Sequence, residues 1–316
     1  MSPTDAVYVA FIGLSGLAMG SLAVLMIGHV MSEHWLAPVR AEVEAASLTM
    51  PLLLLLGLPL AFGLGEIFPW VGGRAGLPPL RASFLSPGFF LLRSAVYLSV
   101  CAALAVWLIR TPHVRRASAV GLALLTPMMS FAAYDWVLSR EPHWWSSLFG
   151  FAFGLSQALA ALALAILVTL LRPEPASPAR MRSLERALLT MALLTLWTWF
   201  AHFIIVWLAN LPDGAAWYMR RADAGSLALL KGAYLLMLAA VLVLVPSGVS
   251  RAGMIAGSAL ALLYHGTHTL WILQPEKDPS WADLAIILGA AAVWFAVFWG
   301  VMRLRPTYAE EAAADP

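Results

Sequence analysis

Cysteine and charge are the two things that this sequence has least of. Its 316 residues include one cysteine, Cys101, which excludes an internal disulfide, a CxxCH haem attachment and a cysteine-ligated iron–sulfur cluster within the chain. Charged residues make up 11% of the chain, against roughly 25% in a soluble protein. The net charge of +2 and the scattered basic residues give no footprint for nucleic acid. A GxxxxGK[ST] motif is also missing, which excludes ATP binding by a P-loop.

The sequence is instead rich in apolar residues. They make up 61% of the chain, and the mean hydropathy is +0.83, so lipid must be the solvent for most of the surface. Asp5 is the only charge before the first apolar run, which lacks the basic flank of a signal peptide, so we expect this run to be retained. The sequence predicts an all-α polytopic membrane protein with about nine transmembrane helices. The predicted spans are 6–31, 47–68, 89–110, 118–138, 147–171, 186–209, 225–245, 252–273 and 281–302.

The longest polar break, at 172–185, divides the predicted spans into two groups. It holds three prolines and five charged residues, a composition typical of an aqueous linker. We therefore predict an N-terminal bundle of five spans (1–171), a cytoplasmic linker (172–185), a C-terminal bundle of four spans (186–303) and a polar tail (304–316). Because no long soluble insertion exists, any chemistry must take place within the helices or at their ends.

The distribution of lysine and arginine over alternate loops predicts the orientation. The side that includes the tail carries 11 of these residues and the opposite side carries 7, with Lys231 left inside the seventh span. This bias favours an outside N-terminus and an inside C-terminus in a bacterial cytoplasmic (inner) membrane. The 11 residues are Arg40, Arg110, Arg115, Arg116, Arg172, Arg180, Arg182, Arg186, Arg251, Arg303 and Arg305; the 7 are Arg74, Arg81, Arg93, Arg140, Arg220, Arg221 and Lys277.

Tryptophans bound the later loops of the less basic side. The hairpins 136–144, 207–217 and 271–281 each begin and end with tryptophan and contain proline, and an earlier loop of this side begins with Pro69 and Trp70. One interpretation is an aromatic belt at the membrane–water interface. The other is a compact platform on which an extrinsic partner docks.

Ionisable groups in the apolar runs are the candidates for chemistry, because burying them in lipid is costly. Asp135 ends the fourth span, and His143 follows in the hairpin after Pro142. A carboxylate and an imidazole at the membrane boundary form a candidate proton-transfer site at the depth of a quinol headgroup. The alternative is that Asp135 caps the hairpin backbone.

Several other polar groups share helix faces. Arg93 and Tyr97 are spaced i,i+4, as are Arg40 and Glu44, and either Asp135 or Glu44 is a candidate partner for Arg93. His265 and His268 lie on one face of the eighth span and His202 lies in the sixth. Together with Arg93 and Glu44 these histidines are candidates for a proton path; the alternatives are interhelical hydrogen bonds for the histidines and a structural ion pair for Arg93. Haem would need two histidines on facing helices, which His265 and His268 cannot provide together. We therefore expect no cofactor on this chain.

Two long sequence blocks contain the hairpins that follow the fourth and sixth spans. The first block reads Asp135-Trp136-Val-Leu-Ser139-Arg-Glu-Pro142-His143-Trp144-Trp-Ser146-Ser-Leu-Phe149-Gly150, and the second reads Phe203-Ile-Ile-Val-Trp207-Leu-Ala-Asn210-Leu211-Pro212, followed by Trp217-Tyr218-Met-Arg220-Arg221. Both blocks resemble the F subunit of alternative complex III, a bacterial quinol:cytochrome c oxidoreductase, within the NrfD-like family of membrane subunits. The likeness extends more weakly over the first seven spans, through Met19–Leu22, Arg40 to Glu44 and Phe89 to Tyr97.

The resemblance implies a helical subunit without a redox centre of its own, built from two helix bundles and associated with proton movement and assembly. It implies partner subunits: an iron–sulfur and molybdopterin-like protein, a multihaem cytochrome c and a second NrfD-like subunit. Iron–sulfur clusters and haem c would belong to these partners, with quinol as the substrate. The family often has glutamine at the position of His202. The residues also leave open a secondary transporter of a small solute, which broken helices in both halves would favour, and a pure membrane scaffold.

Overall fold

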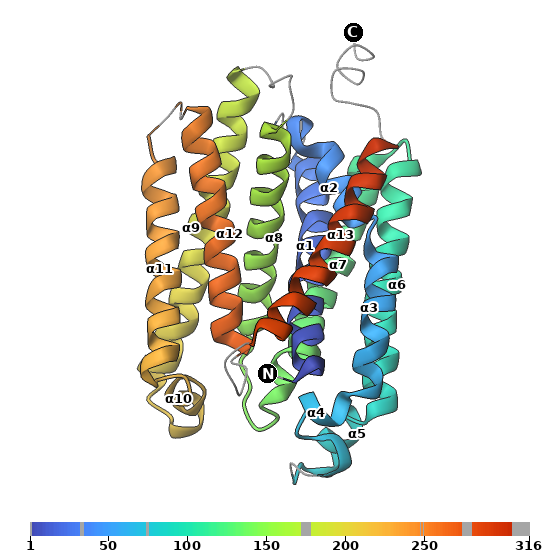
Figure 1. Cartoon of the computed structure of the whole chain (residues 1–316), viewed down its shortest axis with the longest axis vertical. Helices are drawn as coiled ribbons and strands as arrows, with labels where there is room; N and C mark the ends of the chain where they lie inside the picture. The colour runs from blue at the N-terminus through green and yellow to red at the C-terminus, as the bar shows by residue number, and fades with distance from the viewer. Residues whose placement is uncertain are drawn as a thin grey trace.

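The computed structural model of the chain describes residues 2–31, 35–73, 76–171, 178–246, 248, 250–273 and 280–304. Within these residues the secondary structure is helical throughout, without a strand, and the long helices stand side by side as an all-α bundle (Figure 1). Eight helical segments of the described chain are long and apolar enough to cross a membrane. The chain therefore has the architecture of a multi-pass membrane protein.

The helices follow one another in the order of the predicted spans. Their bounds are α1 Pro3–Met31, η1 Ala37–Val39, α2 Arg40–Ser47, α3 Met50–Phe62, α4 Leu64–Ile67, η2 Val71–Gly73, α5 Pro79–Phe84, α6 Pro87–Arg110, α7 Val114–Trp136, η3 Leu138–Arg140, α8 Phe149–Leu170, α9 Pro178–Ala209, α10 Pro212–Met219, α11 Ala224–Leu244, α12 Arg251–Leu273 and α13 Trp281–Arg303. The eighth predicted span corresponds to α12, which is long enough to span but is the one long helix of the described chain outside the eight apolar segments.

Two of the predicted boundaries differ from the structure. Helix α9 begins at Pro178 rather than at 186, so part of the expected linker is helical, while 172–177 lie outside the described residues. The second span runs over 37–62 rather than 47–68. Pro178 can begin α9, because the amide that proline lacks would have no intrahelical partner in the first turn of a helix.

The second span is interrupted between α2 and α3. Leu48 and Thr49 form the break, and Pro51 lies in the first turn of α3, where it has no amide to continue the hydrogen-bond pattern of α2. The Thr49 hydroxyl accepts a hydrogen bond from the indole of Trp294 in α13 (2.8 Å) and donates to the carbonyl of Ala46 (2.7 Å). The break is therefore satisfied by packing and does not line a described cavity.

Helices α1 and α8 form the centre of the molecule. Most of α1 is buried, and it packs against α8, α7, α2, α13 and α3. Glycine permits its close approach to α8: a Cβ on Gly20 would lie 2.3 Å from the carbonyl oxygen of Gln157, and the Gln157 side chain occupies the space beside Gly16.

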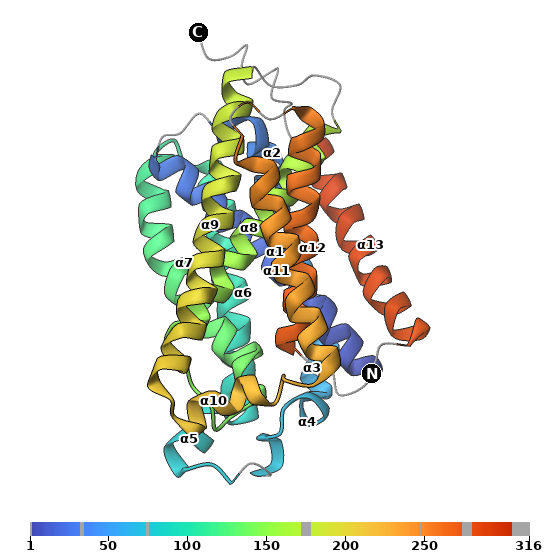
Figure 2. The same ribbon diagram turned by 90° about the vertical axis from the view of Figure 1, so that its left-hand side faces the viewer.

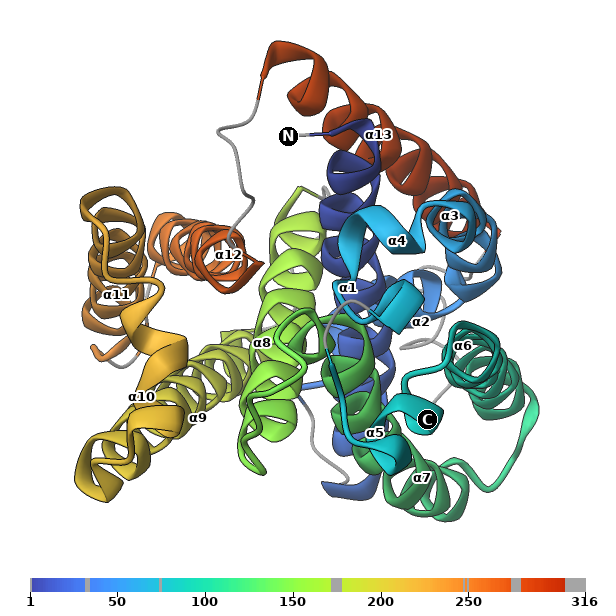
Figure 3. The same ribbon diagram turned by 90° about the horizontal axis from the view of Figure 1, so that it is seen from below.

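Helix α13 leaves the other C-terminal helices and crosses the outside of the N-terminal ones. It packs against α1 and α2 and runs obliquely across the bundle (Figures 1 and 3), while α11 and α12 form a close pair beside α8 and α9. The last predicted span therefore packs with the N-terminal helices, although it belongs to the C-terminal group in the sequence.

The two ends of the bundle carry different structures. We call the end that holds the N-terminus, α4, α5 and α10 the lower end, and the end nearest the C-terminus the upper end, as drawn in Figures 1 and 2. The hairpins 136–144 and 207–217 lie at the lower end, as do α5 with Arg81, η3 with Arg140 and the end of α10 with Arg220 and Arg221. Helices α1, α6, α8 and α11 end at the upper end, so the described helices alternate in direction as the predicted topology requires.

Candidate functional site

Asp135 lies in the last turn of α7 at the lower end, and its carboxylate is enclosed by α6. Both of its oxygens accept hydrogen bonds from the guanidinium of Arg93, each at 2.7 Å, and the phenol of Tyr97 donates a third bond at 2.8 Å. Asp135 is 1% exposed, and the Arg93 side chain is 11% exposed. The i,i+4 spacing of Arg93 and Tyr97 therefore positions two donors on one acceptor, which confirms their shared helix face.

The guanidinium of Arg93 is held on its other sides as well. It donates to the carbonyl of Phe84 (2.7 Å) and lies over the rings of Phe84 (3.9 Å) and Phe89 (4.5 Å). Bidentate geometry with extra hydrogen bonds is the arrangement in which a buried ion pair offsets most of its desolvation cost. Asp135 and Arg93 therefore form an ion pair in which each charged group also has a further hydrogen-bond partner.

The end of α7 is attached to its neighbours through backbone and side-chain hydrogen bonds. The Tyr8 hydroxyl donates to the carbonyl of Trp136 (2.7 Å), and the Trp136 indole donates to Ser94 (2.9 Å). Ser139 donates to the carbonyl of Asp135 (2.5 Å) and accepts from the Trp70 indole (3.2 Å). These bonds join α1, α6, α7 and the 3₁₀ turn η3 around the Asp135 site.

The structure does not bring His143 into this buried site. His143 is exposed in the hairpin, whereas Asp135 is enclosed by Arg93 and Tyr97. Glu44 is a separate case: it pairs with Arg40 (2.9 Å) on α2 at the upper end, as the i,i+4 spacing predicts. The sequence-predicted residues therefore do not form a single site.

A second cluster forms where the first hairpin meets α10. The rings of Trp144 and Trp217 stack with their centroids 5.0 Å apart, and the Trp144 indole donates to the carbonyl of Gly214 (3.0 Å). His202 of α9 is 1% exposed, and its Nδ1 lies 2.6 Å from the hydroxyl of Tyr218. The two sequence blocks that carry the family resemblance thus pack directly against each other.

Charged groups complete this contact, which we call the lower junction (Glu141, Trp144, Trp217, Arg220 and Arg221). Glu141 pairs with Arg221 (2.6 Å) and with Arg220. The buried Arg221 also donates to the carbonyls of Trp217 (2.9 Å) and Ile272 (3.0 Å), and its guanidinium lies 4.0 Å from the centroid of the Trp217 ring.

Two further arginines form hydrogen bonds between the N-terminal and the C-terminal helices. Arg140 donates to the carbonyl of Leu273 at the end of α12, and at the upper end Arg251 donates to the carbonyl of Leu170 at the end of α8. The N-terminal and C-terminal helices are therefore hydrogen-bonded to each other at both ends of the bundle.

His265 and His268 lie buried on α12. His268 packs between Trp199 of α9 (4.6 Å between ring centroids) and Tyr264 (5.2 Å). Among the described residues, His265 has no hydrogen-bond partner at either nitrogen, and the Nε2 atoms of His202 and His268 also lack one. Unsatisfied buried polar groups are uncommon, so these three buried histidines, which we call the histidine layer, form a second candidate site.

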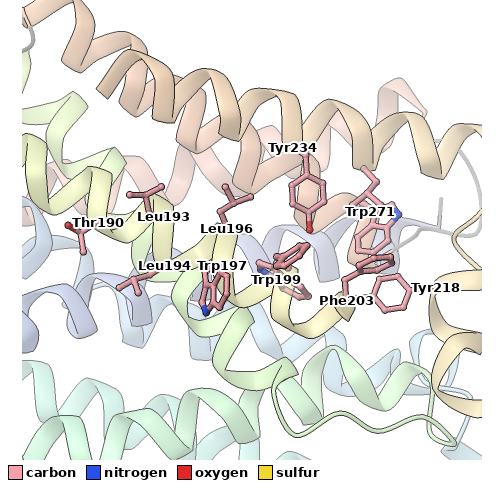
Figure 4. A pocket seen from close by; sticks show the side chains of 12 residues that line it. Thr190, Leu193, Leu194, Leu196, Trp197, Trp199, Phe203, Tyr218, Tyr234 and Trp271 are labelled. Carbon is pink, nitrogen blue, oxygen red and sulfur yellow. The ribbon is translucent and has the colours of Figure 1, made fainter. Parts of the chain in front are cut away.

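A cavity of about 870 Å³ lies between α9 and α11, next to this layer (Figure 4). Its walls are apolar or aromatic along α9, and Trp199, Phe203, Tyr218 and Trp271 gather at one end. Sequence analysis missed it. Its aromatic residues come from α9, α10 and α12, and in an apolar sequence they are indistinguishable from lipid-facing or core residues.

Comparisons with known proteins leave the chain without an assigned family. No protein-family model matches it, and a search of curated proteins gives no significant match.

Proposed function

We propose that this chain is an integral membrane subunit of a quinol-oxidising respiratory complex, of the alternative complex III kind, in a bacterial inner membrane. In this proposal it supports quinol oxidation and proton transfer and anchors redox partner subunits. The chain itself holds no redox centre; iron–sulfur clusters and haem c belong to an iron–sulfur and molybdopterin-like partner and a multihaem cytochrome c, next to a second NrfD-like subunit.

The lower junction is the observation that carries this proposal. The blocks 135–150 and 203–221, which carry the resemblance, are far apart in the sequence, yet Trp144 stacks on Trp217 and Glu141 pairs with Arg221. Because the two blocks pack into one ordered face, we expect that face to act as a unit. A partner subunit outside the membrane would dock on this end.

The histidine layer supports the proton-transfer part of the proposal. A neutral imidazole can donate at one nitrogen and accept at the other, so His202, His265 and His268 are suitable groups for moving protons through an apolar interior. Tyr218 extends this layer to the lower end through its contact with His202. Asp135 has a different part in the proposal: with Arg93 it fixes the end of α7, and the proton-transfer task moves to the imidazoles.

Attachment at both ends of the bundle argues against the transporter alternative. Alternating access requires one group of helices to rock against the other. Arg251 at the upper end and Arg140 at the lower end donate across the two groups, and Arg221 pairs with Glu141 across them, so either opening would break buried or partly buried contacts. A transporter of this type would also have broken helices in both halves, whereas α9, α11 and α12 are continuous over their described lengths.

Purification in mild detergent tests the proposal. A tagged chain produced in its native host should retain an iron–sulfur protein and a multihaem cytochrome c, and the preparation should reduce cytochrome c with added quinol. The Arg221→Ala variant should lose these partners while still inserting, and Arg116→Ala, at the upper end, should retain them. Recovery of the native chain without redox partners would contradict the proposal, and solute uptake by vesicles containing only this chain would favour the transporter.

A further inference from the structure

The cavity between α9 and α11 has the shape of a slot that opens towards lipid. Its lining residues on α9 run from Thr190 to Phe203, which corresponds to about 20 Å along a helix that rises 1.5 Å per residue. On this face Trp197 is 66% exposed and Phe200 is 49% exposed, so the slot is reached from the side, through the region that the bilayer occupies. A lipid chain can enter a slot of this kind without crossing water.

The two ends of the slot differ in chemistry. Thr190, Leu193 and Leu194 lie towards one end, whereas the rings of Phe203, Tyr218 and Trp271 gather at the lower end, with Trp199 between the two ends (Figure 4). Aromatic rings favour stacked or edge-on contact with another flat ring. The geometry therefore matches a molecule with an apolar chain and a ring at one end.

Two tyrosine hydroxyls can bind a hydroxyl or a carbonyl in the slot. The Tyr234 hydroxyl points from α11 into the slot, towards α9 (Figure 4), where it can donate a hydrogen bond. The Tyr218 hydroxyl contacts His202 and keeps a lone pair with which it can accept a further bond. The slot thus offers a donor on α11 and an acceptor at its aromatic end.

The absence of charge from the lining selects among lipids. None of the 12 lining residues is Lys, Arg, Asp or Glu. A phospholipid headgroup would leave its phosphate without a cationic partner there, at a large desolvation cost. We infer that the slot between α9 and α11 is a binding site for an uncharged isoprenoid lipid with a hydrogen-bonding ring, either a membrane quinone or a hydroxylated triterpenoid.

This site adjoins the lower junction, because the Trp217 ring contacts both Tyr218 and Trp271, but its lining includes none of the junction residues. Binding to the chain alone can therefore be tested apart from the assembly of a complex. The test uses the whole chain in nanodiscs of defined phospholipid, without partner proteins. Photoreactive analogues of an isoprenoid quinone and of a hydroxylated triterpenoid are cross-linked, and the labelled peptides are identified by mass spectrometry. Labelling should concentrate on residues 190–203 and 230–234 and should be competed by the unlabelled lipid. The two probes tell the sources apart.

Variants make the test specific. Tyr218→Phe keeps the ring but removes the acceptor, so half-maximal competition should need about 3–10-fold more lipid, the typical effect of one hydrogen bond. Tyr134→Phe, which removes a hydroxyl bound to the Ser147 carbonyl outside the slot, should leave binding unchanged. Leu230→Trp fills the slot and should abolish specific labelling, whereas Leu238→Trp, exposed on the same helix, should not.

Three results would overturn the inference. The first is labelling spread evenly over the lipid-facing helices. The second is equal labelling by a photoreactive phospholipid, and the third is unchanged competition in both Tyr218→Phe and Leu230→Trp. A chain that binds the probe in the slot but purifies without redox partners would leave this inference intact and would contradict only the proposed function.

Discussion

Asp135 shows how much the surroundings of one residue decide its role. From the sequence it is a carboxylate at a membrane boundary, near an imidazole, and it invites a proton-transfer interpretation. In the structure its oxygens accept two bonds from Arg93 and one from Tyr97, while His143 is exposed. A carboxylate with these partners is best suited to hold two helices together.

Replacing Asp135 by asparagine tests this role. Asp135→Asn leaves the guanidinium of Arg93 buried without a counter-charge, and breaking a buried pair in this way costs about 3–5 kcal/mol. Thermal unfolding in nanodiscs should show this loss, and Arg220→Gln, which removes an exposed partner from Glu141 while Arg221 stays paired with it, should cost below about 1 kcal/mol. The proton-transfer hypothesis predicts a different result: a stable, assembled Asp135→Asn complex that oxidises quinol at least about tenfold more slowly.

The adjacent arginines of the lower junction offer a matched pair of substitutions. Arg221 is 6% exposed and binds Glu141 and two carbonyls, whereas Arg220 is 53% exposed. Arg221→Lys loses the planar fork that reaches these acceptors, so it should destabilise the protein by about 2–3 kcal/mol, against about 0–1 kcal/mol for Arg220→Lys. Denaturant titration of both variants gives the comparison. Equal losses would show that burial of Arg221 is not what stabilises the junction.

At the scale of helices, the contact of α1 with α8 depends on glycine at one position. Gly20→Ala places a methyl group 2.3 Å from a backbone oxygen of α8, and backbone cannot move aside as a flexible side chain can. We expect a loss of about 1–3 kcal/mol, typical of overpacking. Gly13→Ala on the same helix meets nothing within 4 Å and should be neutral or slightly stabilising. Unfolding of the two variants in SDS against mild detergent measures the difference.

The elements that sequence analysis predicts well are those set by local composition. Helices α1, α6, α7, α8, α11, α12 and α13 begin and end close to the predicted spans, because apolar runs of membrane length leave the backbone little choice but helix. The break between α2 and α3 escaped prediction, since Pro51 at a span end looks tolerable until Trp294 is seen to satisfy Thr49.

The parts of the site that could be predicted are likewise local. The i,i+4 pairs of Arg93 with Tyr97 and of Arg40 with Glu44 follow from helix geometry alone. The pairing of Glu141 with Arg221 and the slot beside Trp271 depend on how α9, α10 and α12 pack, which the hydrophobic pattern does not specify. The crossing of α13 over α1 and α2 also depends on how the helices pack, so the hydrophobic pattern does not predict it.

For the whole molecule, the alternation of loops predicts which ends face which compartment. Reporter fusions after Ala176 and after Asp213 should report opposite sides, because α8 ends at the upper end and α10 lies at the lower end. The bias of 11 basic residues against 7 favours the cytoplasm for the first fusion. Both fusions on the same side would contradict the topology, and opposite sides in reverse order would contradict the orientation alone.

Helix α1, which precedes the other described helices in the chain, lies at the centre of the molecule. Its main partner, α8, begins about 120 residues after α1 ends, which at about 5–20 residues per second is a delay of roughly 6–24 s. During that delay the faces around Gly16 and Gly20 adjoin lipid or the insertion machinery instead of protein. Lipid is an acceptable neighbour, because Asp5 is the only acidic residue of α1 and the helix has no Lys or Arg. Helix α1 therefore enters the membrane before α8, the helix that covers much of its surface, has been synthesised.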